Sequence, residues 1–225
     1  DVTIPGSAVN PGGTYRVRCK MKDTSGRWSH WSAPVQFVAG EPAATGIMAD
    51  LRITELMYNP LGGKPYEYLE LKNGGSAVAN LSGMYPEGGV SYLFPDETFL
   101  APGGFLVLVD DSATFKGRYP GVPVGGVFSG SLDNAGEKVE LKDEAGVVRA
   151  WVDYDDEGFW PIGPDGFGHS LVLVEAGGRG NDPGRWRASA EVNGSPGAED
   201  PEAEHGGVVI NELLAEGSLP LEDAI

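Results

Sequence analysis

The sequence is poor in the residues that build catalytic and metal centres. It has one cysteine and three histidines in 225 residues. A single cysteine excludes a disulfide within the chain, and none of the histidines has a second metal-ligating residue at a useful spacing. Gly-x-Ser-x-Gly elbows, phosphate-binding loops and His-Glu-x-x-His motifs are also missing. We therefore predict that this chain is not itself an enzyme and has no cofactor, with Ca²⁺ as the one alternative considered below.

Basic residues and long apolar segments are scarce as well. The chain has 16 Lys and Arg against 33 Asp and Glu, a formal net charge of −17. Because binding to nucleic acid depends on neutralising phosphates with cations, we expect no nucleic-acid partner. No run of about 18 apolar residues could span a membrane, and no charged segment followed by an apolar one indicates a secretion signal. We expect no membrane insertion by this chain.

Breakers of regular structure are abundant, with 35 Gly and 17 Pro. Short apolar runs separated by such residues are typical of an all-β sandwich. Only residues 112–119 and 217–225 have a composition suited to a short helix. The strands that we expect in the middle of the chain are residues 51–58, 67–73, 78–84, 90–94, 105–109, 126–128, 137–142, 147–154, 169–174 and 186–188.

The N-terminal segment, residues 1–40, has the pattern of two strands, at residues 14–22 and 33–38, around a turn at residues 23–26. We expect Cys19, within the first strand, to be a small buried side chain. The segment resembles the last two strands of a fibronectin type III domain, with Tyr15 at the place of that family's corner tyrosine.

The following run, Arg27-Trp28-Ser29-His30-Trp31-Ser32, resembles the tryptophan-serine repeat of some fibronectin type III domains, notably those of cytokine receptors. The resemblance implies that arginines of the neighbouring strand stack on the two indoles, and Arg16 and Arg18 are available for this. Such cation–π contacts stabilise a structure by about 0.5–1 kcal/mol each when exposed. A structural role is the favoured interpretation, and a partner-binding patch is the alternative.

After a short linker at residues 41–49, residues 50–200 resemble the lamin tail domain family. The resemblance implies an all-β, immunoglobulin-like antiparallel β-sandwich. Within it, apolar residues on both faces of residues 105–109 indicate a central or covered strand. Pro86 departs from the family pattern, and we expect it to end a strand early. The segments that carry the resemblance are Ile53-Thr54-Glu55-Leu56-Met57-Tyr58-Asn59-Pro60, Glu67-Tyr68-Leu69-Glu70-Leu71-Lys72-Asn73, Asn80-Leu81-Ser82-Gly83-Met84, Leu100-Ala101-Pro102-Gly103-Gly104-Phe105, Leu132-Asp133-Asn134-Ala135-Gly136-Glu137 and Asn193-Gly194-Ser195-Pro196-Gly197.

The start of the same pattern returns near the end of the chain. Ile53-Thr54-Glu55-Leu56-Met57 is echoed by Ile210-Asn211-Glu212-Leu213-Leu214, after an acidic linker at residues 201–207. We therefore expect residues 208–225 to begin a second, truncated lamin tail-like domain. The coiled coil and basic segment that precede this domain in animal lamins are absent. The neighbouring resemblances instead imply a large secreted or cell-surface bacterial protein.

Acidic residues supply the only candidates for metal ligands. Ca²⁺ prefers six to eight oxygen ligands, and the densest cluster of carboxylates is Asp153, Asp155, Asp156 and Glu157. Asp110 and Asp111 could join this cluster in the folded chain. The alternative interpretation is a solvated loop.

Three glutamates in strand patterns require separate explanations. Glu67 and Glu70 are three residues apart and are expected on opposite faces of one strand, which argues against a shared catalytic site. Glu55 is expected on the apolar face of Ile53 and Met57. A carboxylate there needs hydrogen-bond donors, so we expect a structural bond to loop amides or a nearby cation such as Arg52, with catalysis as the alternative.

The function that these patterns favour is a non-catalytic spacer or adhesion module, with a protein or a glycan as its partner. The alternative is an accessory carbohydrate- or Ca²⁺-binding domain of an extracellular enzyme. The candidate contact residues are loop aromatics, of which at least two are expected to pack in the core instead: Tyr85, Tyr92, Phe159 and Trp160. The sequence does not determine the oligomeric state.

Overall fold

The computed structural model describes residues 13–38, 50–174 and 180–201. The linker expected at residues 41–49, the helix expected at residues 217–225 and the second domain expected from residue 208 lie outside the described residues. So do His205 and Glu212.

The described residues are almost entirely β-structure, as predicted. Their one α-helix is α1 (Ser112–Arg118), which confirms the short helix expected there. Two 3₁₀ turns, η3 (Lys64–Tyr66) and η4 (Pro183–Arg185), are also present. The strands are β1 (Thr14–Val17), β2 (Val35–Val38), β3 (Leu51–Met57), β4 (Tyr68–Asn73), β5 (Ala79–Asn80), β6 (Tyr85–Glu87), β7 (Val90–Ser91), β8 (Phe99–Leu100), β9 (Phe105–Val109), β10 (Val124–Val127), β11 (Ser129–Gly130), β12 (Gly136–Lys142), β13 (Val148–Asp155), β14 (Leu171–Leu173) and β15 (Trp186–Ala188).

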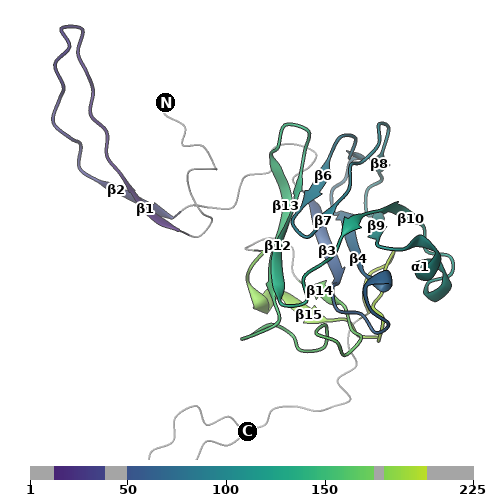
Figure 1. The fold of residues 1–225 in the computed structure, drawn as a ribbon. Coiled ribbons are helices and arrows are strands. Elements are labelled where there is room, and N and C mark those ends of the chain that lie inside the picture. The colour runs from purple at the N-terminus through teal and green to yellow at the C-terminus, as the bar shows by residue number, and fades with distance from the viewer. Residues whose placement is uncertain (1–12, 39–49, 175–179, 202–225) are drawn as a thin grey trace, which may run out of the picture.

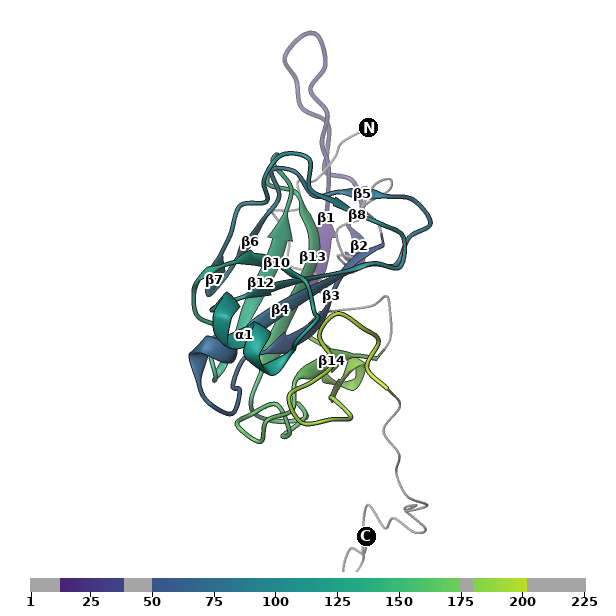
Figure 2. The same ribbon diagram turned by 90° about the vertical axis from the view of Figure 1, so that its right-hand side faces the viewer.

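Two main sheets form the sandwich. The larger has six strands in the order β10-β9-β4-β3-β14-β15, and the smaller has the order β13-β12-β6. All neighbours in these sheets are antiparallel except β9 and β10, which run parallel. Figure 1 shows β12 and β13 on one side of the larger sheet and α1 on the other, and Figure 2 shows the same sheets turned by 90°. The main core lies between the two sheets.

Strand β9 shows how both faces of the larger sheet are covered. Leu108 is buried in the main core and Leu106 packs against it. Val107 and Val109 belong to a second apolar cluster, which includes Phe115 of α1. The prediction of a central or covered strand at residues 105–109 is confirmed.

The prediction for Pro86 is wrong in one respect. Pro86 does not lie beyond a strand but in the middle of β6, where it pairs with Leu141 of β12 and is buried. Strand β6 is an edge of its sheet, and an edge strand tolerates proline because the missing N–H can face away from the ladder. The long strand expected at residues 78–84 is only β5, since the chain turns where the Met84 N–H donates to the Leu81 carbonyl.

The N-terminal hairpin is shorter than predicted. Strands β1 and β2 pair from Thr14 with Val38 to Val17 with Val35. Cys19 follows the end of β1 and its side chain is exposed, so the expectation of a buried side chain is wrong. The physical reason is that the hairpin forms a sheet of only two strands, which has no second layer among the described residues. No described helix is long and apolar enough to cross a membrane.

Candidate functional site

A β-bulge in β3 determines which way its glutamate points. Ile53 pairs with Leu71 and Glu55 with Glu70, so Thr54 is an extra residue without its own partner. Such an insertion reverses the alternation of side chains beyond it. Ile53 therefore faces the main core, whereas Met57 belongs to the second cluster on the opposite face. The expectation that Glu55 shares a face with both residues is wrong for Ile53.

Glu55 is 2% exposed and is surrounded by hydrogen-bond donors. It accepts hydrogen bonds from the Tyr68 hydroxyl at 2.6 Å, from the Ser195 N–H at 2.9 Å and from the Ser170 hydroxyl. Burial raises the pKa of the Glu55 carboxyl, and these hydrogen bonds oppose the rise. The expected structural bond to a loop amide is confirmed, whereas Arg52 pairs with Asp50 instead.

Glu70 lies beside Glu55 on the neighbouring strand and is 1% exposed. It accepts hydrogen bonds from the Gly197 N–H and from the Thr54 hydroxyl, both at 2.7 Å. Burial and then the charge of Glu55 raise the Glu70 pKa to about 8. The bulge thus brings Thr54 and two carboxyls to one face of the larger sheet.

A third acidic side chain, Asp200, completes the group. It pairs with Arg187 and accepts hydrogen bonds from the Ser195 hydroxyl at 2.9 Å and the Ala190 N–H at 3.0 Å. We call Glu55, Glu70 and Asp200 the carboxylate cluster, and residues 193–200 the C-terminal loop. Each acid of the cluster is bonded to this loop or forms part of it.

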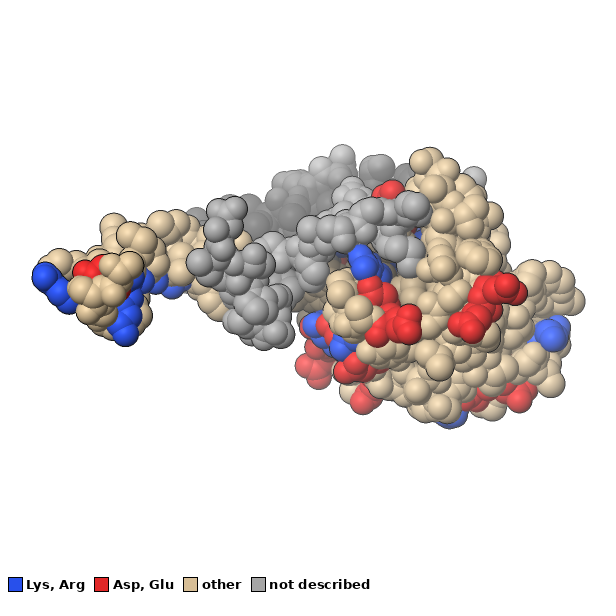
Figure 3. Space-filling model, turned by 90° about the horizontal axis from the view of Figure 1, so that it is seen from above, with Lys and Arg blue, Asp and Glu red and all other residues tan. Residues whose placement is uncertain are grey.

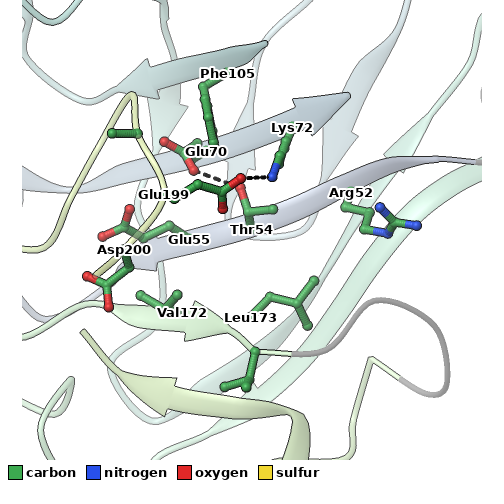
Figure 4. A pocket seen from close by; sticks show the side chains of 12 residues that line it. Arg52, Thr54, Glu55, Glu70, Lys72, Phe105, Val172, Leu173, Glu199 and Asp200 are labelled. Carbon is green, nitrogen blue, oxygen red and sulfur yellow. Dashed lines mark hydrogen bonds and ion pairs between the residues drawn. The ribbon is translucent and has the colours of Figure 1, made fainter. Parts of the chain in front are cut away.

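Figure 4 shows a small pocket that the carboxylate cluster lines together with Lys72 of β4 and Phe105 of β9, and Glu199 is paired to Lys72 there. The pocket has a volume of about 140 Å³. Binding pockets for small molecules usually measure about 300–1,000 Å³. The pocket is therefore smaller than the usual small-molecule site.

Adjacent carboxyls with raised pKa values are also found at catalytic sites. Here, however, both oxygens of Glu70 accept hydrogen bonds from the protein, and Glu55 is covered by the C-terminal loop. A general acid or base must reach a substrate atom within hydrogen-bond distance. The cluster is therefore suited to fastening the loop rather than to catalysis.

Glu67 does not take part in this cluster. It accepts hydrogen bonds from the Leu132 N–H and the Ser131 hydroxyl, each at 2.9 Å. Burial raises the pKa of Glu67, and these hydrogen bonds offset only part of the rise. As predicted, Glu67 and Glu70 have separate surroundings.

The acidic residues considered for Ca²⁺ are divided between different elements. Asp110 pairs with Lys64 at 2.5 Å, and Asp111 caps α1 by accepting a hydrogen bond from the Thr114 N–H at 2.7 Å. Asp153 lies on β13 opposite Lys138, and Asp155 accepts from the Glu157 N–H at 2.9 Å. Among the described residues, no group of three or more Asp, Glu, His or Cys is arranged to hold a metal ion.

Of the four candidate aromatics, Trp160 is buried in the core and Tyr92 is half-buried and packs against it. Trp160 is 9% exposed and its ring lies 6.5 Å from that of Trp186. Tyr92 packs edge-on against Phe94 at 5.0 Å. Tyr85 is half-buried in β6. Phe159, at 95% exposure, is the candidate whose side chain stands free for a ligand.

The hairpin carries three cations that stack on two tryptophan rings. We call these five residues the basic ladder: Arg18, Lys20, Lys22, Trp28 and Trp31. The Lys20 ammonium lies 4.6 Å from the Trp28 ring centre and 4.9 Å from that of Trp31. Arg18 lies 5.2 Å from Trp31, and Lys22 lies 5.5 Å from Trp28.

The expected role of Arg16 in this row is wrong. Arg16 pairs with Gln36 across the hairpin and donates a hydrogen bond to its side chain at 3.1 Å. Arg18 stacks on Trp31 as expected, and Lys20 and Lys22, which the tryptophan-serine pattern did not indicate, supply the other cations.

The two facing sheets and the scarcity of helix define the class of protein, an immunoglobulin-like β-sandwich. Residues 45–156 match the family model of the Lamin Tail Domain, which supports the resemblance of this part of the chain to that family. The family consists of non-enzymatic immunoglobulin-like modules. Strands β14 and β15 lie beyond the match but belong to the same sheet as β3. No curated protein matches the chain.

Proposed function

We propose that this chain is a non-catalytic spacer or adhesion module of a large multidomain secreted or cell-surface bacterial protein. The observation that carries the proposal is the carboxylate cluster, whose acids are bonded to the chain's own hydroxyls, amides and Arg187. Polar groups that are fully satisfied inside a fold rigidify it. The resemblance of the hairpin to fibronectin type III and the echo of residues 53–57 at residues 210–214 support the multidomain setting.

The bonds of the cluster link parts of the chain that are far apart. Glu55 of β3 is 140 residues from Ser195, and Glu70 of β4 is 127 residues from Gly197. Since the last described residues are fastened to strands near the start of the domain, a load on the chain after residue 201 is transmitted to the centre of the larger sheet. This arrangement suits a spacer that has to stay folded between neighbours.

Single-molecule stretching of the whole chain tests the spacer proposal. We expect the 151 residues from 50 to 200 to unfold in one main step, releasing roughly 500 Å of chain at about 3.3–3.6 Å per residue. Release in several small steps at low force would contradict the proposal, because such a domain could not keep a fixed spacing.

A second candidate function is an accessory carbohydrate- or Ca²⁺-binding domain, and the exposure of Phe159 beside Asp155 and Asp156 favours it. A glycan array probed with the wild-type chain and with Phe159→Ala tests the carbohydrate part. Phe99→Ala is the matched control, since Phe99 is also exposed, at 58%, on β8. Loss of binding in the first variant alone would favour the second candidate.

Calorimetric titration with Ca²⁺ tests the metal part. Under the spacer proposal we expect no saturable heat. A saturable signal that disappears in Asp155→Asn/Asp156→Asn would replace the spacer proposal by the Ca²⁺-binding one.

A further inference from the structure

Charge is divided very unevenly along the described chain. Residues 13–38 contain five basic residues and one acidic residue, a net charge of +4, whereas residues 50–200 contain 11 basic and 24 acidic residues, a net charge of −13. Figure 3 shows Lys and Arg gathered on the hairpin and several Asp and Glu on the visible face of the sandwich. The hairpin is thus a basic element in an acidic chain.

The basic ladder presents its charges as a regular, partly ordered row. Arg18, Lys20 and Lys22 alternate along the chain, and in extended backbone every second residue points the same way at a spacing of about 6.6–6.8 Å. Their stacking on the two indoles orders side chains that are otherwise flexible. All three cations are exposed. A preordered row of cations loses less entropy when it binds a partner.

The sandwich carries a group of opposite charge at the end of β13. Asp153 and Asp155 point outward from β13, because the alternating residues Val152 and Tyr154 are buried. Asp156 and Glu157 follow in the bend after β13, where the Glu157 N–H donates to the Asp155 side chain, and Asp155 and Glu157 are exposed. We call residues 153–157 the acidic row.

The surroundings leave the acidic row available. Strand β13 is an edge of its sheet, where the Gly180 carbonyl accepts a hydrogen bond from the Asp153 N–H at 3.3 Å, so the exposed members of the row are Asp155 and Glu157. The nearest cation on the paired strand, Lys138, is engaged with Glu140 at 2.5 Å and with the ring of Trp151. Within the described part of the chain, no cation forms an ion pair with a residue of the acidic row.

We propose that the basic ladder of one copy of this chain binds the acidic row of a second copy. The occupant follows from the complementary charge of the two rows. Because two different surfaces meet, the contact is heterologous and leaves a free ladder and a free row at the ends. Copies therefore associate head to tail. The inference rests on the proposed role as an interaction module.

Sedimentation velocity of the whole chain at 50 mM and 500 mM salt is the first measurement. We expect the average mass to rise with concentration at low salt and to fall to that of the monomer at high salt, because exposed charge pairs are screened. A chain that stays monomeric at low salt would overturn the self-association, while the stretching experiment would still decide the spacer role.

Charge reversal identifies the surfaces. We expect Lys20→Glu/Lys22→Glu and Asp156→Lys/Glu157→Lys each to weaken association at least tenfold, and an equimolar mixture of the two variants to restore it. The second variant leaves Asp155 and its turn intact, and it tests the contact even if the first disturbs the hairpin. Lys116→Glu and Glu144→Lys, which reverse exposed charges elsewhere, are the matched controls. Association that persists in both double variants, or a mixture that stays monomeric, would refute the proposal.

Discussion

Glu70 is the residue for which burial has the clearest consequence. Its pKa is about 8, against an ordinary value of 4.5, because it is buried next to Glu55. Between these two values the folded chain holds a proton that the unfolded chain has released. The free energy of unfolding therefore falls as the pH rises from about 4.5 to 8. The contribution of Glu70 to stability is complete below about pH 4.5.

We predict that Glu70→Gln stabilises the chain at alkaline pH. The amide cannot ionise, its oxygen can still accept from Gly197, and its NH₂ group can donate to the Thr54 hydroxyl. One unit of pKa shift corresponds to about 1.4 kcal/mol, and we expect a gain of about 1–3 kcal/mol at pH 8.5 and little change at pH 4.5. Denaturant unfolding at the two pH values measures it.

The control for this prediction is Glu144→Gln, since Glu144 is exposed in the turn before β13. It is expected to leave the pH dependence of unfolding unchanged. If Glu70→Gln and the wild type lose stability in parallel above pH 5, the carboxyl is not protonated in the fold and our explanation fails.

At the scale of the element, the loop after β13 contains two neighbouring aromatics with opposite environments. Trp160 is 9% exposed and packs against Trp186, which anchors the loop to β15. Phe159 is 95% exposed. Only the first contributes to the packing of the loop on the sheet.

We predict that Trp160→Ala lowers the free energy of unfolding by about 3–5 kcal/mol, because it leaves a large cavity. Phe159→Ala, one residue earlier, is expected to change it by less than about 0.5 kcal/mol. Chemical denaturation of both variants measures the two changes in the free energy of unfolding. Equal effects would show that the loop is not anchored through Trp160.

At the scale of the whole molecule, the sandwich depends on residues beyond the family match at residue 156. Leu171 of β14 pairs with Leu56 of β3, and Trp186 of β15 is buried in the main core. The C-terminal loop supplies the N–H groups that bind Glu55 and Glu70.

We predict that a chain of residues 45–156 does not unfold cooperatively, whereas one of residues 45–201 does. Without the later strands and loop, β3 becomes an exposed edge, and Glu55 and Glu70 lose the donors that Ser170, Ser195 and Gly197 supply. Thermal unfolding followed by circular dichroism distinguishes the two chains. A sharp transition in the shorter chain would show that β14, β15 and the loop are dispensable.

Local patterns predicted most strands of three or more residues closely. The strand expected at residues 186–188 is β15, and the one expected at residues 105–109 is β9. Their apolar alternation is a property of neighbouring residues and needs no partner to be recognised. Strands of two residues, such as β8 and β11, were not predicted, because such strands exist only through the hydrogen bonds of the strand opposite.

The sequence by itself determined the all-β class, the positions of the long strands and the need of Glu55 for hydrogen-bond donors, since these depend on residue type and local order. Only the tertiary structure decided that a bulge at Thr54 turns Glu55 away from Ile53, and that Ser195 and Gly197 meet the two glutamates from far along the chain. It also decided that Lys20 and Lys22, not Arg16, stack on the tryptophans. The physical reason is that strand pairing and loop closure, which no local pattern records, set these contacts.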